Sequence, residues 1–448
     1  MLVVNDDNGR AAKKTVCLYD WYYILVIFAY ILTLVSLKIR PGVIAAGLML
    51  IVLLQLFINR RIRIKTLTDI FTVIYFAYNV LSVIPLILSG LPVTVYLNEF
   101  AVSILPMVFY FAGRGYDGLR FSDENEASAS FYEKFIFAML IVGFLGIYFH
   151  IFAPDHYIQY SYELNFISKA DAATSRVRMD SVIGCTLLGA MGVTGMLAGS
   201  YFIDKRECFK DLKKTRLKGI IYIFCNFVFA VLSNQRSAMV ASFIVIIYIN
   251  YLLFKQFDII RKKYFKYEVA AVFILLAALW AFDHELLLKI WWRLESLPSA
   301  ISERSEQWIA AINNMYSTWF GNGLGANGHK ALGIENTHVI ADGGLVKLYC
   351  EEGIIGFSIY VYLLIMTLKK GLLNIRKYYV ETGIICMALL QSIGSNIIAF
   401  QLALPVFWYA VGRINSESAD TGSEVVMSPD NESRDNESKD NESEAGTK

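Results

Sequence analysis

Charged residues are scarce in this sequence. Asp, Glu, Lys and Arg together make up 18% of its 448 residues, whereas 56% of the residues are hydrophobic. A soluble chain of this length would carry more charge and would show amphipathic periodicity. Apolar runs long enough to cross a bilayer recur along the whole chain, so the sequence predicts an all-α polytopic membrane protein.

Patterns that mark metal or nucleotide chemistry are also absent from the sequence. The six cysteines show no C-x-x-C spacing and lie mostly in or beside apolar runs, which favours buried hydrophobic side chains over a zinc site or a disulfide frame. No Asp-x-Asp motif of the metal-dependent glycosyltransferases occurs. The sequence thus predicts no metal, no cofactor and no nucleic-acid partner.

The apolar runs predict about twelve spans within one transmembrane domain at residues 21–412. The first run lacks a small-residue cleavage site, so we expect a first span there and not a signal peptide. The expected spans are residues 21–37, 43–58, 67–88, 94–113, 134–153, 181–203, 218–233, 237–254, 267–283, 353–368, 382–397 and 399–412. The last two are also compatible with one long or broken helix.

Basic residues indicate the orientation of these spans. Clusters of Lys and Arg follow the second, sixth, eighth and tenth spans, on the same side as the N-terminal segment 1–20. Because cytoplasmic loops are enriched in Lys and Arg, we expect both termini in the cytoplasm. The C-terminal segment 413–448 contains three copies of Asp-Asn-Glu-Ser, which predicts a disordered acidic tail.

One large outward loop follows from this arrangement, at residues 283–352. It collects polar residues that include Arg304, His338, Asp342 and Glu352. Histidine can act as a base near neutral pH, although loop histidines are also common as ordinary solvated side chains. If residues 338–342 are helical, Asp342 lies on the same face as His338 and can orient its ring.

Arginines on the outward side oppose the usual enrichment of basic residues in the cytoplasm. Arg176, Arg178, Arg236 and Arg304 all lie there, and Arg236 belongs to the short hairpin 233–237 between two spans. A guanidinium can bind a diphosphate through two hydrogen bonds without a metal. The alternative is that these side chains reach lipid headgroups or pair with nearby glutamates.

Glycines crowd the segment Gly321-Asn322-Gly323-Leu324-Gly325, which we call the glycine run. It has neither a preceding strand nor the Lys-Ser/Thr of a nucleotide P-loop, so we expect no nucleotide site. The density of glycine, at Gly323 and Gly325 in particular, indicates a tight backbone turn close to the membrane or to a ligand.

Several motifs together resemble the bacterial O-antigen polymerase and O-antigen ligase superfamily, over about residues 170–412. Residues 234–238 (Asn-Gln-Arg-Ser-Ala) are similar to its S-R-[SG]-A turn, and residues 303–308 to its R-x-x-x-W segment. The glycine run resembles its G-x-G-x-G turn, and Thr337-His338 with residues 348–356 resembles its H-N … E-x-G-i-i-G stretch. Val339 stands where the superfamily usually has Asn, so a role of that Asn has no counterpart here.

The resemblance implies a GT-C-like, metal-independent glycosyltransferase at the outer face of the bacterial cytoplasmic membrane. Its donor and acceptor would be oligosaccharides linked to undecaprenyl diphosphate, with Arg236 and Arg304 at the donor's diphosphate and His338 as the base on the acceptor hydroxyl. Arg176 and Arg178 would bind the second lipid-linked substrate. A chain-length regulator and a flippase are the protein partners that the resemblance suggests.

Three functions follow as alternatives. A polysaccharide repeat-unit polymerase would transfer a growing glycan onto a new lipid-linked repeat unit of O-antigen, capsule or exopolysaccharide. An O-antigen ligase would pass the same glycan to the lipid A core of lipopolysaccharide. A lipid-linked oligosaccharide flippase would need matched halves and ionisable residues inside the spans, of which Glu99 is the clearest in the sequence.

Overall fold

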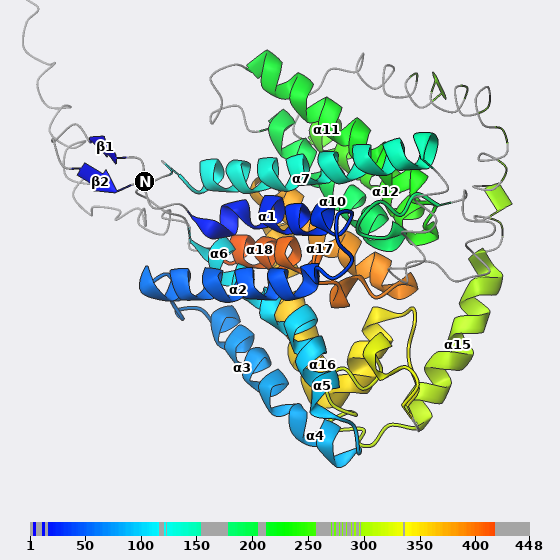
Figure 1. The fold of residues 1–448 in the computed structure, drawn as a ribbon. Coiled ribbons are helices and arrows are strands. Elements are labelled where there is room, and N and C mark those ends of the chain that lie inside the picture. The colour runs from blue at the N-terminus through cyan, green and yellow to red at the C-terminus, as the bar shows by residue number, and fades with distance from the viewer. Residues whose placement is uncertain are drawn as a thin grey trace, which may run out of the picture. The chain divides into compact units, whose positions relative to one another are not determined.

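The computed structural model of this protein describes residues 3–5, 11–13, 17–115, 121, 123–153, 178–204, 212–256, 297–334 and 337–416, with scattered residues between 270 and 295 (Figure 1). Arg176, most of the expected span 267–283 and residues 417–448 of the expected tail lie outside these described residues. A short antiparallel pair, β1 (Val3–Asn5) and β2 (Ala11–Lys13), precedes the helices.

Eight described helical segments are long and apolar enough to cross a membrane, which confirms the predicted membrane class. They are Pro41–Ile58 (α2), Leu67–Leu88 (α3, Leu67–Leu81, and α4, Val83–Leu88), Val93–Arg114 (α5, Val93–Glu99, to α6, Val108–Arg114), Glu124–Phe152 (α7), Cys185–Asp204 (α10), Lys214–Leu232 (within α11, Leu212–Leu232), Arg236–Leu253 (including α12, Arg236–Asn250) and Gly344–Leu373 (α16). The count of twelve spans stays a prediction.

Three further helices lie among these segments. The apolar helix α1 (Leu18–Leu32) packs on α2 and α7, and α17 (Ile375–Gly394) packs on α16 and on α18 (Leu404–Ile414). The region 382–412 therefore contains two separate helices, with a short 3-10 turn at Ile397–Ala399 between them. Because α18 continues to Ile414, the expected tail boundary at 413 lies inside its last turn.

Small residues allow the helices to approach closely. A side chain at Gly113 of α6 would meet the Tyr409 carbonyl oxygen at 2.2 Å, and one at Gly412 of α18 would meet the Tyr110 oxygen at 2.0 Å. The backbones of α6 and α18 are thus in direct contact (Figure 1). Lipid tails are as apolar as the helices, so such close packing is a main source of stability in membrane bundles.

The helix α16 differs most from the expectation. It begins at Gly344 and not at residue 353, so residues 344–352 belong to a candidate span and the loop predicted at residues 283–352 ends earlier than expected. The helix is also broken, because Gly353 has φ 65° and ψ −171°, values that only glycine adopts readily. The described part of the segment before it contains α15 (Leu297–Asn313) and a 3-10 turn at His329–Ala331.

Candidate functional site

The glycine run forms a tight turn that packs against three helices. Gly321, Gly323 and Gly325 all have positive φ, of 73°, 87° and 90°. A side chain at Gly323 would lie 2.5 Å from the backbone nitrogen of Leu86 in α4, and one at Gly325 would lie 2.9 Å from Cβ of Glu99 in α5. The predicted tight turn is therefore present, and the glycines are required because protein backbone lies against them.

This turn supplies hydrogen bonds where α16 is broken. The Gly323 N–H donates to the Glu351 carbonyl oxygen at 2.9 Å, and the Ile354 N–H donates to the Thr318 oxygen at 2.9 Å. The Tyr78 hydroxyl donates to the carbonyl oxygen of Glu352 at 2.5 Å. A break at membrane depth is tolerated only where protein satisfies the freed backbone groups, so the glycine run and the broken helix form one unit.

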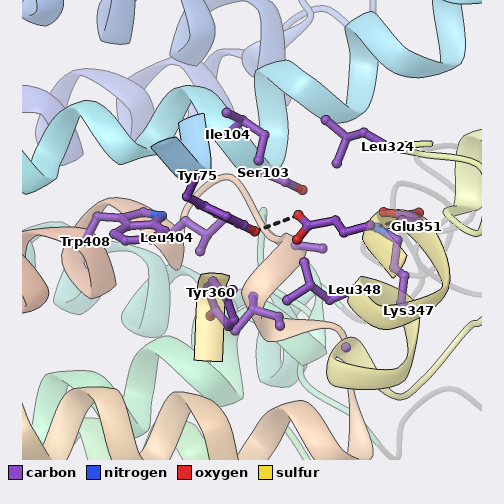
Figure 2. Close-up of a pocket in the computed structure, with 14 residues that line it drawn as sticks. Tyr75, Ser103, Ile104, Leu324, Lys347, Leu348, Glu351, Tyr360, Leu404 and Trp408 are labelled. Carbon is purple, nitrogen blue, oxygen red and sulfur yellow. Dashed lines mark hydrogen bonds and ion pairs between the residues drawn. The ribbon is translucent and has the colours of Figure 1, made fainter. Parts of the chain in front are cut away.

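A buried ion network lies on the first turns of α16. The Lys347 ammonium nitrogen is 2.5 Å from Glu99 Oε1 and 3.6 Å from Glu351 Oε1, and all three side chains are buried. Figure 2 shows Lys347 and Glu351 of this network. Ser103 donates to Glu99 Oε1 at 2.7 Å. Of these three charged residues, the sequence indicated only Glu99 inside a span, whereas the structure places Lys347 and Glu351 on the helix α16 as well. The i, i+4 spacing of Lys347 and Glu351 in an apolar stretch was the available signal.

Asn327 connects this network to the segment that carries His338. Its backbone N–H donates to Glu351 Oε1 at 3.1 Å, and its Nδ2 donates to the His338 carbonyl oxygen at 2.7 Å. Its own carbonyl oxygen accepts from the Ile340 N–H at 3.0 Å, and Asn322 donates to its Oδ1 at 3.0 Å. The main chain at His338 is thus tied to the end of α16, while the His338 side chain stays half-buried.

Asp342 has a different partner from the expected one. Residues 338–342 are not helical, so the condition for Asp342 to orient His338 is not met. The Arg304 Nη2 atom donates to Asp342 Oδ2 at 2.7 Å, and Trp308 Nε1 donates to the Asp342 carbonyl oxygen at 2.7 Å. Arg304 and Trp308 are one turn apart on α15, so this helix face holds the chain just before α16.

The end of α17 brings Arg304 close to the start of α12. A Cβ atom placed at Gly394 would lie 3.6 Å from Arg304 Nη1 and 3.6 Å from Ser237 Cβ. The Arg304 Nη1 and Ser237 Cβ atoms are therefore at most 7.2 Å apart. Asn396 donates to the carbonyl oxygens of Ile340 and Ala341, both at 2.9 Å. The last residue of α17 therefore lies next to Ser237 at the start of α12, and the segment after α17 is hydrogen-bonded to residues 340 and 341, close to His338 in the chain.

Arg178 lies beside the same turn. The neighbouring Met179 N–H donates to the Leu232 carbonyl oxygen at 3.1 Å, at the end of α11. Arg236 is the first residue of α12, four residues further along the chain. The Arg178, Arg236, Arg304 and His338 side chains are all half-buried, as expected of groups that a ligand can reach. Sequence reasoning selected these four, whereas it missed Lys347, Asn327 and Asn396.

His329 is a second histidine near the buried network. Burial lowers its pKa from the ordinary value of 6.5, and the positive charge of Lys347 lowers the pKa further. A side chain at the preceding Gly328 would lie 3.1 Å from Glu99 Oε2, which places this turn over the ion pair. His329 is therefore favoured in its neutral form.

The arrangement can bind an anion and accept a proton on one side of the bundle. Guanidinium groups suit phosphate oxygens, and a half-buried imidazole can act as a base. The described residues contain no group of three or more His, Cys, Asp or Glu side chains placed to hold a metal ion. Comparison with models of known families finds no match for this chain, and comparison with curated proteins finds none either.

Proposed function

We propose that the protein is a metal-independent glycosyltransferase that polymerises polysaccharide repeat units at the outer face of the bacterial cytoplasmic membrane. It would transfer a growing glycan from one undecaprenyl diphosphate onto a new lipid-linked repeat unit. The observation that carries the proposal is the convergence of Arg304, the start of α12 at Arg236 and the His338 segment around the end of α17.

The chemistry of glycosyl transfer fits these groups. A leaving diphosphate gains negative charge, which guanidinium groups stabilise without a metal. Arg236 and Arg304 are assigned this role, and Arg304 keeps Nη1 directed towards Gly394 while Nη2 is bound to Asp342. His338 is assigned as the base that removes the proton from the acceptor hydroxyl. Arg178, together with Arg176, is assigned to the second lipid-linked substrate.

A deletion strain complemented with variants tests the proposal. We expect the deletion strain to carry a single repeat unit on its lipid core, and we expect His338→Ala to fail to restore long chains. His329→Ala is the matched control, since this histidine also lies on the outward segment but is not assigned to the reaction. Full chain elongation by His338→Ala would refute the base assignment, and full activity of Arg236→Lys would refute the two-bond diphosphate contact.

The ligase alternative predicts a different product in the same strain. A ligase acts after polymerisation, so its loss would leave polymer on the undecaprenyl carrier and no glycan on the lipid A core. The glycan attached to each lipid therefore separates the two enzymes. Either result keeps the assigned arginines and His338, because both enzymes use the same donor.

A lipid-linked oligosaccharide flippase gains support from one observation. Transporters commonly bind their coupling ions at broken helices inside the membrane. The break at Gly353 of α16 lies beside the buried side chains of Lys347, Glu351 and Glu352. If the protein is a flippase, the deletion strain would retain repeat units on the cytoplasmic side and would show neither polymer nor single units on the surface.

A further inference from the structure

A small cavity lies at the break of α16, between an aromatic cluster and the buried ion network. Tyr75, Tyr360 and Trp408 line it on one side and Lys347 on the other, and Glu352 is also part of the lining (Figure 2). Its volume of about 20 Å³ is enough for one or two water molecules and too small for a sugar or a phosphate.

Three polar atoms at this cavity have no hydrogen-bond partner within the part of the chain that the structure describes. They are Glu352 Oε2, the Tyr360 hydroxyl and Trp408 Nε1, and none of these residues is more than 3% exposed. Buried polar groups almost always find a partner, so three such atoms around one cavity point to an occupant. Trp408 can only donate, whereas a Tyr hydroxyl can donate or accept.

The charges around Glu352 do not balance an ionised carboxylate. The groups that face it are Tyr75, Tyr78 and the Asn79 amide from α3, and Lys347, Glu351 and Tyr360 from α16. Lys347 is the only base among them, and Glu99 and Glu351 already share it. An isolated buried charge is very unfavourable, and protonation removes it.

We propose that this cavity is an internal proton and water site, in which Glu352 is a neutral carboxylic acid hydrogen-bonded to an ordered water. The Tyr75 hydroxyl donates to Glu352 Oε1 at 2.6 Å, which leaves Oε2 to hold the proton and donate it to the water. The water can then accept from or donate to the remaining polar groups of the lining. No bond is formed or broken, and the site binds only one proton and solvent.

A metal cation is a poorer occupant than water. The N–H group of Trp408 cannot act as a ligand, and the ammonium of Lys347 in the same lining would repel a cation.

The proposed proton lies next to the break in α16. Glu352 directly precedes Gly353, and its carbonyl oxygen accepts a hydrogen bond from the Tyr78 hydroxyl. Loss of the proton from the Glu352 carboxyl group would therefore place a negative charge at the break, next to Glu351.

Infrared spectra of the full-length protein in lipid test the site. We expect a carbonyl band of a protonated carboxylic acid that shifts in D2O, disappears in Glu352→Gln and persists in Glu351→Gln. The thermal midpoint of Glu352→Gln should stay close to that of the wild type, because Gln has the shape and neutrality of the acid. A band that is absent from the wild type, or that persists in Glu352→Gln, overturns the proposal.

Two further measurements keep the test decisive if Glu352→Gln does not fold. Tyr75→Phe removes the donor to Oε1, so the wild-type band should shift without vanishing, and an unshifted band would contradict the assignment. Exchange of choline for Na⁺ should leave the band unchanged. If Na⁺ abolishes the band, the cavity binds a cation in place of the proton and the proposal is wrong.

Discussion

Replacing Asn327 tests how strongly the His338 segment is held. All four polar groups of Asn327 form hydrogen bonds, and the residue is 1% exposed. In Asn327→Ala the two side-chain bonds are lost, at about 1 kcal/mol each, and a carbonyl oxygen without its donor adds about 1–3 kcal/mol. We expect the free energy of unfolding to fall by about 3–5 kcal/mol.

Asn327→Asp has nearly the same shape and should be at least as destabilising. The new carboxylate oxygen would face the His338 carbonyl oxygen, which is 2.7 Å from the present Nδ2 donor. It would also add a buried negative charge next to Glu351, whose Oε1 accepts from the Asn327 N–H. The comparison between Ala and Asp therefore separates loss of a donor from loss of shape.

Unfolding in mixed detergent micelles gives the stability, and the length distribution of the surface glycan measures the proposed polymerase activity. Asn314→Ala is the matched control, because Asn314 directly follows α15 and its exposed side chain donates to the Ala310 oxygen at 2.7 Å. Its loss should change stability by no more than about 0.5 kcal/mol. If Asn327→Ala is as stable as Asn314→Ala and elongates glycans normally, Asn327 does not position His338.

Other substitutions test the break of α16 at Gly353, the protonation of His329 and the ion pair between Arg304 and Asp342. Gly353→Ala should lower the free energy of unfolding by about 2–6 kcal/mol, since backbone strain of about 1–3 kcal/mol adds to about 1–3 kcal/mol of overpacking against Trp319. Gly333 also has a positive φ but no atom within 4 Å of a side chain placed there, so Gly333→Ala should show the strain alone in the same unfolding assay. The lowered pKa of His329 means that the unfolded chain binds more protons, so stability should fall as the pH drops below about 6.5, and His329→Gln should flatten this dependence in thermal scans. If His329→Gln leaves the pH dependence of stability unchanged, His329 does not cause that dependence. Arg304→Lys should alter stability by less than about 1 kcal/mol, because its pair with Asp342 is partly exposed, yet lower the elongation rate at least about tenfold; equal elongation would exclude Arg304 from diphosphate binding.

Local features of the fold were accessible from the sequence. Hydropathy identified membrane-crossing helices, because a span needs about 20 consecutive apolar residues and this requirement is local. The tight turn of the glycine run was predicted correctly, since glycine density reports backbone conformation directly. Hydropathy placed the start of α16 at residue 353, because Lys347, Glu351 and Glu352 make residues 344–352 polar although the structure buries them.

Partners distant in sequence were not accessible. The proximity of Asp342 and His338 suggested a pair, but the Asp342 carboxylate binds Arg304, 38 residues earlier in the chain. Glu99 and Lys347 are 248 residues apart, and nothing local in either segment indicates the other. Such contacts depend on which helices pack together, and many pairings satisfy the same pattern of apolar residues.

The sequence by itself determined that this chain is a helical membrane protein. It did so because bilayer thickness and the cost of burying charge act on every segment separately. Only the tertiary structure decided which of its polar residues meet. The break at Gly353, the shared cation of Lys347 and the four hydrogen bonds of Asn327 arise where α5, α16 and the glycine run pack together, and packing is a property of the whole chain.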